Sequence, residues 1–276
     1  MSEAGPLSLL KADENDPGAF VAEGFERYVN RHRDKQGTLP AALELKYLHS
    51  LRVSENARLI AQELKRTLKE ILLAEGCGLI HDIGRFSQFV RYGSFHDAVT
   101  VDHGQEGFRT LEDEQIPQHF DEDDWERIAC AVAYHNKKVS DIPANLEERL
   151  KYFLRLIRDA DKLDIMELVM KAVTSNGFTK LSDMLPYIST GRELTPGMME
   201  EILKTKTVSV NNLRTVTDFV VMLASWFYDL NYAPARALAA DRHILERIEH
   251  ELPNSKDIRT LLTDIKRCTL LDKWKN

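Results

Sequence analysis

The sequence predicts an all-α fold, and three observations support this prediction. Apolar residues recur at spacings of three and four along almost the whole chain, the period of a helix with one buried face. Alternating strand patterns bounded by hairpin turns are nearly absent. An apolar content of 43% allows a substantial core in a chain of 276 residues. We therefore expect a helical protein with one large domain or two modest ones.

The predicted helices follow the apolar period, and Pro40 suits a helix start while Gly84 and Gly177 suit helix ends. They cover residues 19–33, 41–66, 68–83, 103–114, 123–137, 145–174, 196–205, 211–230, 233–252 and 255–272. Residues 99–102 and 207–210 are compatible with short extended pieces. Residues 84–102 break the pattern and predict a loop, of a length that is often functional.

The chain is expected to divide into a tail, a main domain and an extension. Residues 1–18 are polar and contain two prolines, which predicts a loose tail. Residues 19–175 are predicted to form the main helical domain, and residues 176–276 a helical extension packed on the same domain.

Composition excludes several classes of function. A net charge of −7 gives no general attraction to nucleic acid or to anionic membranes. The amino terminus lacks a basic segment followed by an apolar one, and no apolar run approaches the roughly 18 residues of a membrane helix. Three distant cysteines form no CxxC pair, which argues against a disulfide framework or a thiolate zinc site. A cytoplasmic location is therefore expected.

Polar residues interrupt the apolar faces of three predicted helices. His49 continues the apolar stripe of residues 41–66, His135 that of residues 123–137, and Asp161 that of residues 145–174. Alone, each histidine is more simply a hydrogen-bonded core residue. A buried carboxylate, however, must be neutralised, paired or bound to metal. Several such groups facing inward together are explained by one shared metal.

The dipeptide His81-Asp82 is the sharpest local feature. It follows the apolar run ILLAEGCGLI, which predicts a centrally buried helix that carries both residues near its carboxyl end. Adjacent helical residues diverge by about 100°, but at a helix end both can reach one ion. A second dipeptide, His96-Asp97, has no apolar helix before it and predicts a surface or lid feature.

The order of His49, GLIHDIGRF with His81-Asp82, and RDADKLDI with Asp161 resembles the HD-domain superfamily of metal-dependent phosphohydrolases. The resemblance covers about residues 40–170. It implies an HD-domain helical bundle that binds a divalent metal through these four residues. Asp159 and Asp164 would then be supporting or structural.

Two further histidines, His103 in VDHGQEGF and His135 in AVAYHNKK, match the extra histidines of HD subgroups that bind two metals. The resemblance implies that Asp82 bridges the ions and that these histidines hold the second one. The absence of a GYP segment argues against cleavage of cyclic di-GMP. Nitrogen and oxygen ligands suit Mn²⁺, Fe²⁺, Zn²⁺, Ni²⁺ or Mg²⁺, and several imidazoles disfavour Mg²⁺ alone.

The resemblance implies hydrolysis of a nucleotide or related small phosphate ester by a metal-activated hydroxide. Asp82 and Arg85 are the expected catalytic residues. The candidate phosphate-binding cations are Arg52, Arg85 and Lys137, each of which could also be a solvated surface charge. Two alternatives stay open: a di-iron oxygenase resembling myo-inositol oxygenase, and a non-catalytic nucleotide sensor. The expected partner is a small phosphorylated substrate.

Overall fold

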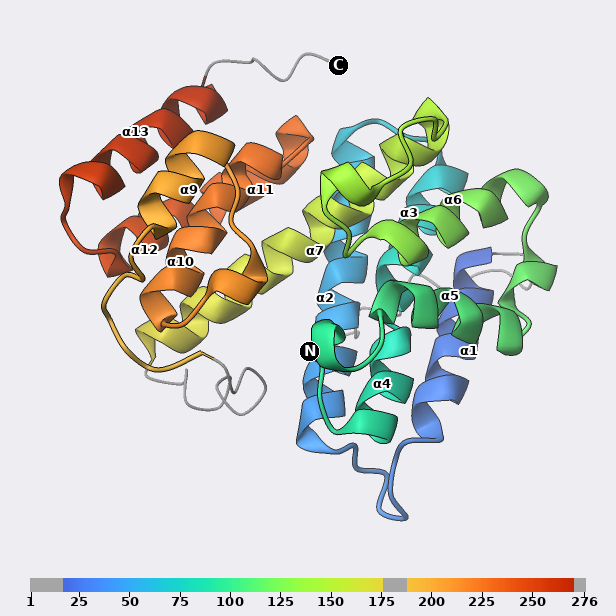
Figure 1. Ribbon diagram of the computed structural model, residues 1–276. Helices are drawn as coiled ribbons and strands as arrows, with labels where there is room; N and C mark the ends of the chain where they lie inside the picture. Colours follow the sequence, from blue (N-terminus) through green and yellow to red (C-terminus); the bar gives the residue numbers. More distant parts are fainter. Residues whose placement is uncertain (1–16, 176–187, 271–276) are drawn as a thin grey trace, which may run out of the picture. The chain divides into compact units, whose positions relative to one another are not determined.

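The computed structural model describes residues 17–175 and 188–270, and helices dominate these residues (Figure 1). Ser189 and Thr215 form an isolated bridge, and no named strand occurs in this described part of the chain. The all-α prediction is therefore confirmed. Residues 99–102 and 207–210 form no strand, so the extended pieces considered for them are wrong. Gly177 lies outside the described residues.

The chain divides into two compact units, Met1–Asp164 and Ile165–Asn276. The boundary lies inside α7, a continuous helix over Glu148–Thr174. The division predicted after residue 175, and the packing of the extension on the main domain, stay predictions.

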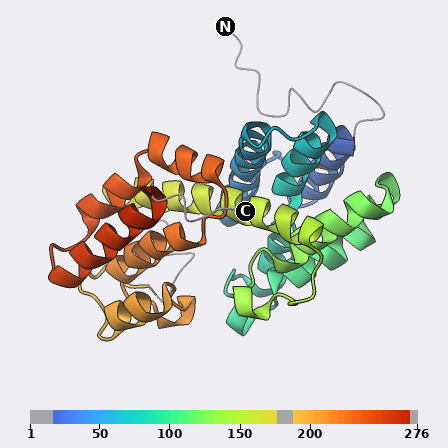
Figure 2. The same cartoon turned by 90° about the horizontal axis from the view of Figure 1, so that it is seen from above.

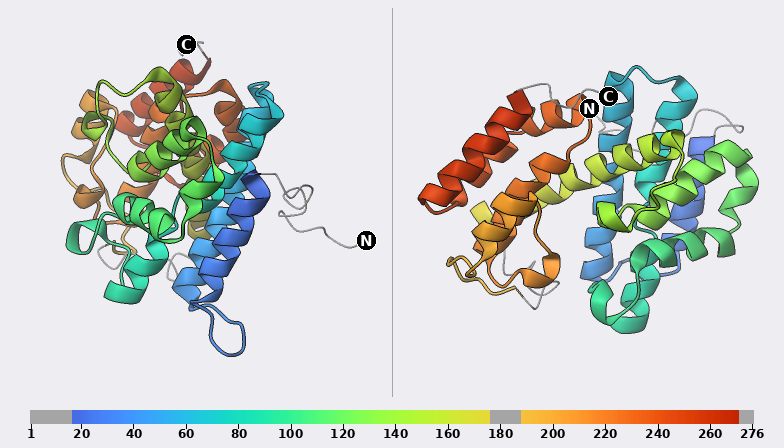
Figure 3. Two further views of the ribbon diagram at one scale, coloured as in Figure 1. Left: turned by 90° about the vertical axis from the view of Figure 1, so that its right-hand side faces the viewer. Right: turned by 45° about the horizontal axis from the view of Figure 1, so that its top comes forward.

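The first unit is a bundle in which α3 is the central helix. In this bundle α3 packs against α1, α2 and α6, while α4 packs against α2 and α5. The left panel of Figure 3 shows α1 and α2 joined by the loop over residues 31–40. Besides α7, the α-helices of this unit are α1 (Pro17–Asn30), α2 (Ala41–Glu63), α3 (Leu68–Ile80), α4 (Gly84–Tyr92), α5 (His103–Asp113) and α6 (Glu122–Tyr134).

The carboxyl-terminal part of helix α3 is buried because its sequence is apolar around most of its circumference. It begins at a capping box in which the Thr67 side chain accepts from the Glu70 backbone and Glu70 accepts from the Thr67 backbone. Every residue from Leu73 to Ile80 is buried. A Cβ on Gly78 would lie 2.9 Å from the Ser54 Cα, so this glycine allows α2 and α3 to approach closely.

The segment predicted as a loop contains a helix, α4, and this prediction was wrong. Gly84 begins α4 instead of ending the preceding helix, and α4 ends at Gly93, whose φ is +63°. Gly84 serves a different purpose, since its φ is not positive. A Cβ there would lie 2.9 Å from the Gly107 Cα and still closer to the His103 carbonyl oxygen, so Gly84 lets α4 and α5 touch.

The second unit is built around α10, in which every residue is buried. Helices α12 and α13 pack on α10, and α11 packs on α12 (Figure 2). The predicted helix over residues 233–252 breaks at His243, which has a φ of +52°. Besides the end of α7, the α-helices in the described part of this unit are α9 (Met198–Thr205), α10 (Val216–Ser225), α11 (Ala233–Asp241), α12 (Ile244–Glu251) and α13 (Lys256–Leu270).

Short 3-10 turns connect the helices of both units. They are η2 (Asp97–Val99), η3 (Ile116–His119), η4 (Val139–Asp141), η5 (Val210–Asn212) and η6 (Trp226–Asp229). Among the described residues, no helix combines the length and the apolar character that crossing a membrane requires.

Candidate metal centre

The structure brings all six predicted metal ligands together inside the first unit. Their ligand atoms form overlapping groups of three, and within each group these atoms lie within 4.8 Å of one another. Five of the six residues are buried, and Asp161 is partly exposed. The ligands are His49 from α2, His81 and Asp82 from the turn after α3, His103 from the start of α5, His135 from the end of α6, and Asp161 from α7.

A tight turn allows His81 and Asp82 to face the same centre. After α3 the backbone makes 3-10-type bonds from the Ile83 amide to the Ile80 carbonyl (3.0 Å) and from the Arg85 amide to the Asp82 carbonyl (2.9 Å). The turn leads directly into α4. The two adjacent side chains therefore leave the backbone at a helix junction and not within a regular helix.

The two carboxylate oxygens of Asp82 face different ligands. Asp82 Oδ1 lies 3.3 Å from His103 Nε2 and 3.4 Å from His135 Nε2. Asp82 Oδ2 lies 3.6 Å from His49 Nε2 and 3.8 Å from His81 Nε2. Neighbouring ligands on one ion, each about 2.1 Å from it, are separated by roughly 3.0–3.4 Å. The distances at Oδ1 match this separation and those at Oδ2 exceed it by a few tenths of an ångström, so Asp82 could serve as a ligand on both of its sides.

Asp161 completes the set on the Oδ2 side of Asp82. Its Oδ1 lies 3.2 Å from His49 Nε2 and 3.7 Å from His81 Nε2. The ligand atoms of His81, His135 and Asp161 also lie within 4.8 Å of one another, so this group runs across both sides of Asp82. The distances to the two Asp82 oxygens divide the ligands into one set with His49, His81, Asp82 and Asp161 and another with Asp82, His103 and His135. This division agrees with the one that the family resemblance implies.

Backbone carbonyls orient two of the histidine rings. His81 Nδ1 lies 2.7 Å from the Gly78 carbonyl oxygen, and His135 Nδ1 lies 2.9 Å from the Val132 carbonyl oxygen. A carbonyl can only accept, so each Nδ1 carries the proton and donates it. In the neutral ring Nε2 is then the atom with a free lone pair, as a metal ligand requires.

Carboxylates orient the other two rings. His49 Nδ1 lies 2.6 Å from Asp164 Oδ2, and His103 Nδ1 lies 2.5 Å from Asp97 Oδ2. Each Nδ1–H donates to an ionised carboxylate, which fixes the ring and raises the basicity of Nε2. All four histidines thus present Nε2 to the centre.

The donor set fits divalent ions. Among the described residues, His49 Nε2 and His81 Nε2 are buried atoms without a hydrogen-bond partner. A buried polar atom without a partner is costly, and a metal would satisfy both nitrogens. Histidine nitrogens with carboxylate oxygens are ligands that Mn²⁺, Fe²⁺, Zn²⁺ and Ni²⁺ accept.

The electrostatic environment keeps the carboxylates ionised. Burial alone would raise the pKa of Asp82, but the Lys46 ammonium and His81 hold that pKa well below its ordinary value. The pKa of Asp161 is likewise held well below its ordinary value, because its close contacts with the His49 and His81 rings outweigh burial. Both carboxylates are therefore charged at neutral pH and able to bind a cation.

Two of the histidines are held neutral by their surroundings. Burial, and then the positive charge of Arg85, lower the pKa of His103 to about 3. Burial also lowers the pKa of His81. His49 differs, because the nearby carboxylates of Asp161 and Asp164 raise its pKa even though burial opposes this. The neutral rings need not lose a proton before an ion binds.

The predicted substrate-binding cations are engaged by carboxylates around the centre. Arg52 Nε lies 2.5 Å from Asp164 Oδ1, and Arg85 Nη1 lies 2.7 Å from Asp97 Oδ1. Lys137 pairs with Asp102, the residue that caps α5. In the structure these cations hold the carboxylates around the ligand set. Their roles in substrate binding stay predictions.

The sequence predicted a surface or lid feature at Asp97 and missed its contact with the centre. Its side chain is 33% exposed, and it is a partner of the ligand His103 that also accepts from Arg85 and Gln88. Gln88 on α4 donates to the Val101 carbonyl as well (3.0 Å), which holds residues 97–101 against the helix. Asp97 could not be recognised without α4, since the helix is what returns this segment to the centre.

Lys46 was also missed. It lies three residues before His49 on α2, and its Nζ lies 2.8 Å from Asp82 Oδ2. The helical spacing of the two residues was the available signal, because residues three apart share a helix face.

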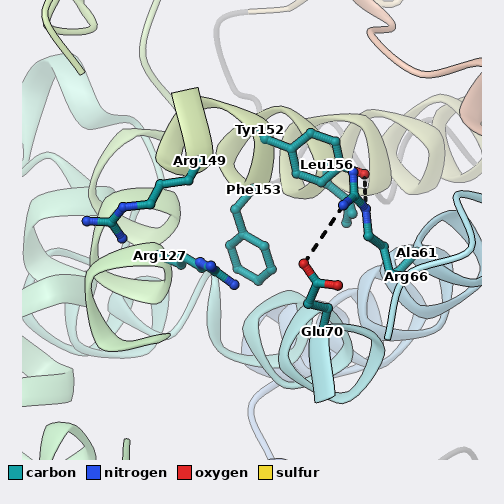
Figure 4. Close-up of a pocket in the computed structure, with 8 residues that line it drawn as sticks. All are labelled: Ala61, Arg66, Glu70, Arg127, Arg149, Tyr152, Phe153 and Leu156. Atoms are coloured by element: carbon teal, nitrogen blue, oxygen red, sulfur yellow. Dashed lines mark hydrogen bonds and ion pairs between the residues drawn. The ribbon is translucent and has the colours of Figure 1, made fainter. Parts of the chain in front are cut away.

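A separate cavity of about 260 Å³ lies away from the ligands (Figure 4). Its three arginines have carboxylate partners: Arg66 lies 3.9 Å from Glu70, and Arg127 and Arg149 each lie 2.6 Å from Asp123. We therefore place the chemistry at the histidine and aspartate cluster. The cavity is lined by Ala61, Arg66, Glu70, Arg127, Arg149, Tyr152, Phe153 and Leu156.

Replacing Asp164 or Asp97 by asparagine is expected to weaken one ion at a time. Asp164→Asn removes the carboxylate behind His49, and Asp97→Asn removes the one behind His103. Each change should lower the affinity for one ion by about 10- to 100-fold, the usual effect of losing such a supporting partner. Competition titration with a chelating dye measures both affinities, and Asp141→Asn on η4 provides the control. If either variant lost affinity equally for both ions, the division into two sets would be contradicted.

The comparisons with known proteins agree with this geometry. The family model described as HD domain matches residues 47–166. No curated protein and no solved structure shows significant similarity to the chain. The matched range contains all six clustered ligands. Residues 47–166 of the chain therefore match the HD domain, and the cluster that they hold could bind a metal ion, as this family does.

Proposed function

We propose that the protein is a metal-dependent phosphohydrolase that acts on a nucleotide or a related small phosphate ester. One observation carries the proposal: four histidines, each oriented through Nδ1, direct Nε2 toward the two oxygens of one buried carboxylate, Asp82. A pure binding protein has no need of such a preorganised ligand set. The match of residues 47–166 to the HD domain supports the same reaction class.

The residues have distinct tasks in this proposal. His49, His81, Asp82 and Asp161 would hold one ion, while Asp82, His103 and His135 would hold the other. Bound there, the ions would supply an activated water and neutralise charge on the phosphoryl oxygens. Asp164 and Asp97 fix the rings of His49 and His103, so the ligand set keeps its shape before an ion binds.

Arg85 is positioned to stabilise negative charge beside the centre. Its Nε lies 3.6 Å from Asp82 Oδ1, and this buried nitrogen has no hydrogen-bond partner among the described residues. Its Nη1 is held by Asp97, Gln88 and the Phe95 carbonyl. A guanidinium anchored on one side and free to donate on the other suits a phosphate oxygen.

The test is metal-dependent release of phosphate. We expect the protein, stripped with a chelator, to be inactive, and to regain activity with Mn²⁺, Fe²⁺, Zn²⁺, Ni²⁺ or Mg²⁺ when offered a panel of nucleotides and sugar phosphates. Colorimetric phosphate detection and chromatography of the products measure this. Asp141→Asn, outside the ligand set, should behave as the wild type.

Other outcomes would contradict the proposal. Oxygen consumption that requires iron, without phosphate release, would favour an oxygenase resembling myo-inositol oxygenase. Nucleotide binding without turnover under any of these metals would favour a sensor.

A further inference from the structure

Among the described cations near the centre, Lys46 makes the shortest ion pair with a clustered ligand. Arg52 pairs with Asp164 and Lys137 with Asp102, neither of which is a clustered ligand. Arg85 pairs with Asp97 at 2.7 Å, and its Nε lies at the longer distance of 3.6 Å from Asp82 Oδ1. Lys46 Nζ instead lies 2.8 Å from Oδ2 of Asp82, the shared ligand. Within residues 17–175 and 188–270, no other carboxylate lies within ion-pair distance of Lys46 Nζ.

The position of the lysine couples it to the ion. Asp82 Oδ2 is the oxygen that faces His49 and His81, so it belongs to the first set of ligands. A divalent ion bound there would share this oxygen with the ammonium. Two positive charges on one oxygen repel each other strongly in a buried site. The lysine therefore neutralises Asp82 without metal and opposes the binding of an ion.

Once an ion takes Asp82 Oδ2, Lys46 needs another anion. Its side chain is only 15% exposed, and its Nζ lies 5.6 Å from the centre of the Phe95 ring, which supplies a face but no charge. A mostly buried ammonium without a negative partner is unfavourable. An oxygen of a phosphate group bound to the ions would supply that partner.

We infer that Lys46 is a phosphate-binding residue that an incoming metal ion displaces from Asp82. The inference rests on the proposed function and adds a substrate contact and an order of binding. The metal ion binds first and frees the Lys46 ammonium from Asp82. The phosphate binds second and forms an ion pair with Lys46. Metal and phosphate therefore bind cooperatively.

The experiment measures the affinities of the full chain for Mn²⁺ and for phosphate, which should change in opposite directions. Lys46→Met keeps the length of the side chain and removes the charge. We expect Lys46→Met to bind Mn²⁺ about tenfold or more tightly, since the competitor is gone. The Mn²⁺-loaded variant should bind inorganic phosphate about tenfold or more weakly, since a charged donor is lost. Calorimetry or dye competition gives both values without turnover.

Matched variants separate charge from packing. Lys46→Arg keeps the charge and should leave the Mn²⁺ affinity close to that of the wild type. Lys69→Met makes the same chemical change at an exposed lysine that pairs with Asp121 and Asp124, and should change neither affinity. Unchanged or weaker Mn²⁺ binding in Lys46→Met would overturn the displacement. Unchanged phosphate binding would overturn the phosphate contact.

A measurement on the wild type covers the case in which Lys46→Met fails to fold. Labelling of lysine amines, read by mass spectrometry, should increase at Lys46 when Mn²⁺ is added and decrease again with phosphate, with Lys69 as the internal reference. No change at Lys46 with either addition would overturn the inference. If these binding effects occur but no phosphate ester is hydrolysed, the proposed function fails while the role of Lys46 in binding stands.

Discussion

Replacing Asp82 by asparagine is expected to remove both ions and to abolish phosphate release. Each oxygen of Asp82 faces one set of ligands, so a single change removes the negative charge from both. Metal stabilisation of a transition state is worth several kcal/mol, which corresponds to a loss of about 10³-fold or more in rate. Metal content after dialysis and kcat with the best substrate measure the two effects.

Loss of activity must be separated from loss of fold, because Asp82→Asn leaves the Lys46 ammonium without its carboxylate. Removing one partner of a buried ion pair costs about 3–5 kcal/mol, whereas removing both is often neutral. The double variant Lys46→Met/Asp82→Asn should therefore melt at a higher temperature than Asp82→Asn and still bind no metal. If Asp82→Asn retained both ions, a bridging carboxylate would be ruled out.

Replacing Gly84 by alanine is expected to have the largest effect on stability. The added Cβ would meet the backbone of α5 at His103 and Gly107, and backbone atoms cannot move aside as the end of a flexible side chain can. Overpacking of this kind costs about 1–3 kcal/mol and sometimes more. That cost would lower the melting temperature by roughly 2–6 °C in a chain of this size. The affinity for the second ion should fall too, because His103 begins the displaced helix.

Gly76→Ala is the matched control in α3. A Cβ there would lie 3.5 Å from the Val21 side chain, an ordinary van der Waals contact. Alanine is favoured over glycine within a helix by about 0.5–1 kcal/mol, so this variant should be as stable as the wild type or more so. Thermal denaturation followed by circular dichroism compares the two. Equal stability of Gly84→Ala and Gly76→Ala would refute the close approach of α4 and α5.

Five of the six metal ligands could be predicted from a local signal, whereas His103 was predicted from the family resemblance alone. His49, His135 and Asp161 lie on apolar helix faces, where a polar residue needs a buried partner. His81 and Asp82 follow an apolar segment that only a central helix would contain. Helix periodicity is a property of neighbouring residues, so the sequence was sufficient for most elements of the first unit.

The supporting residues could not be predicted in the same way. Gly84 resembles a helix terminator in sequence, yet its role is to admit α5, which only the assembled bundle reveals. Because the sequence did not predict α4, no helix was expected for residues 93–102 to pack against. Asp97 was therefore predicted to belong to a surface or lid feature. Lys46 and Arg52 look like ordinary surface cations until α3 and α7 bring Asp82 and Asp164 to them. Contacts between segments that are distant in the chain produce no periodic pattern in the sequence.

The number of ions per chain tests the central claim most directly, namely that two divalent ions share Asp82. Mass spectrometry of the metal content, after loading with Mn²⁺ and removal of the excess, should give two ions per chain for the wild type. The variant His103→Ala/His135→Ala should retain one, since His49, His81, Asp82 and Asp161 are unchanged. A wild type that holds a single ion, with the same content in the double variant, would contradict the claim.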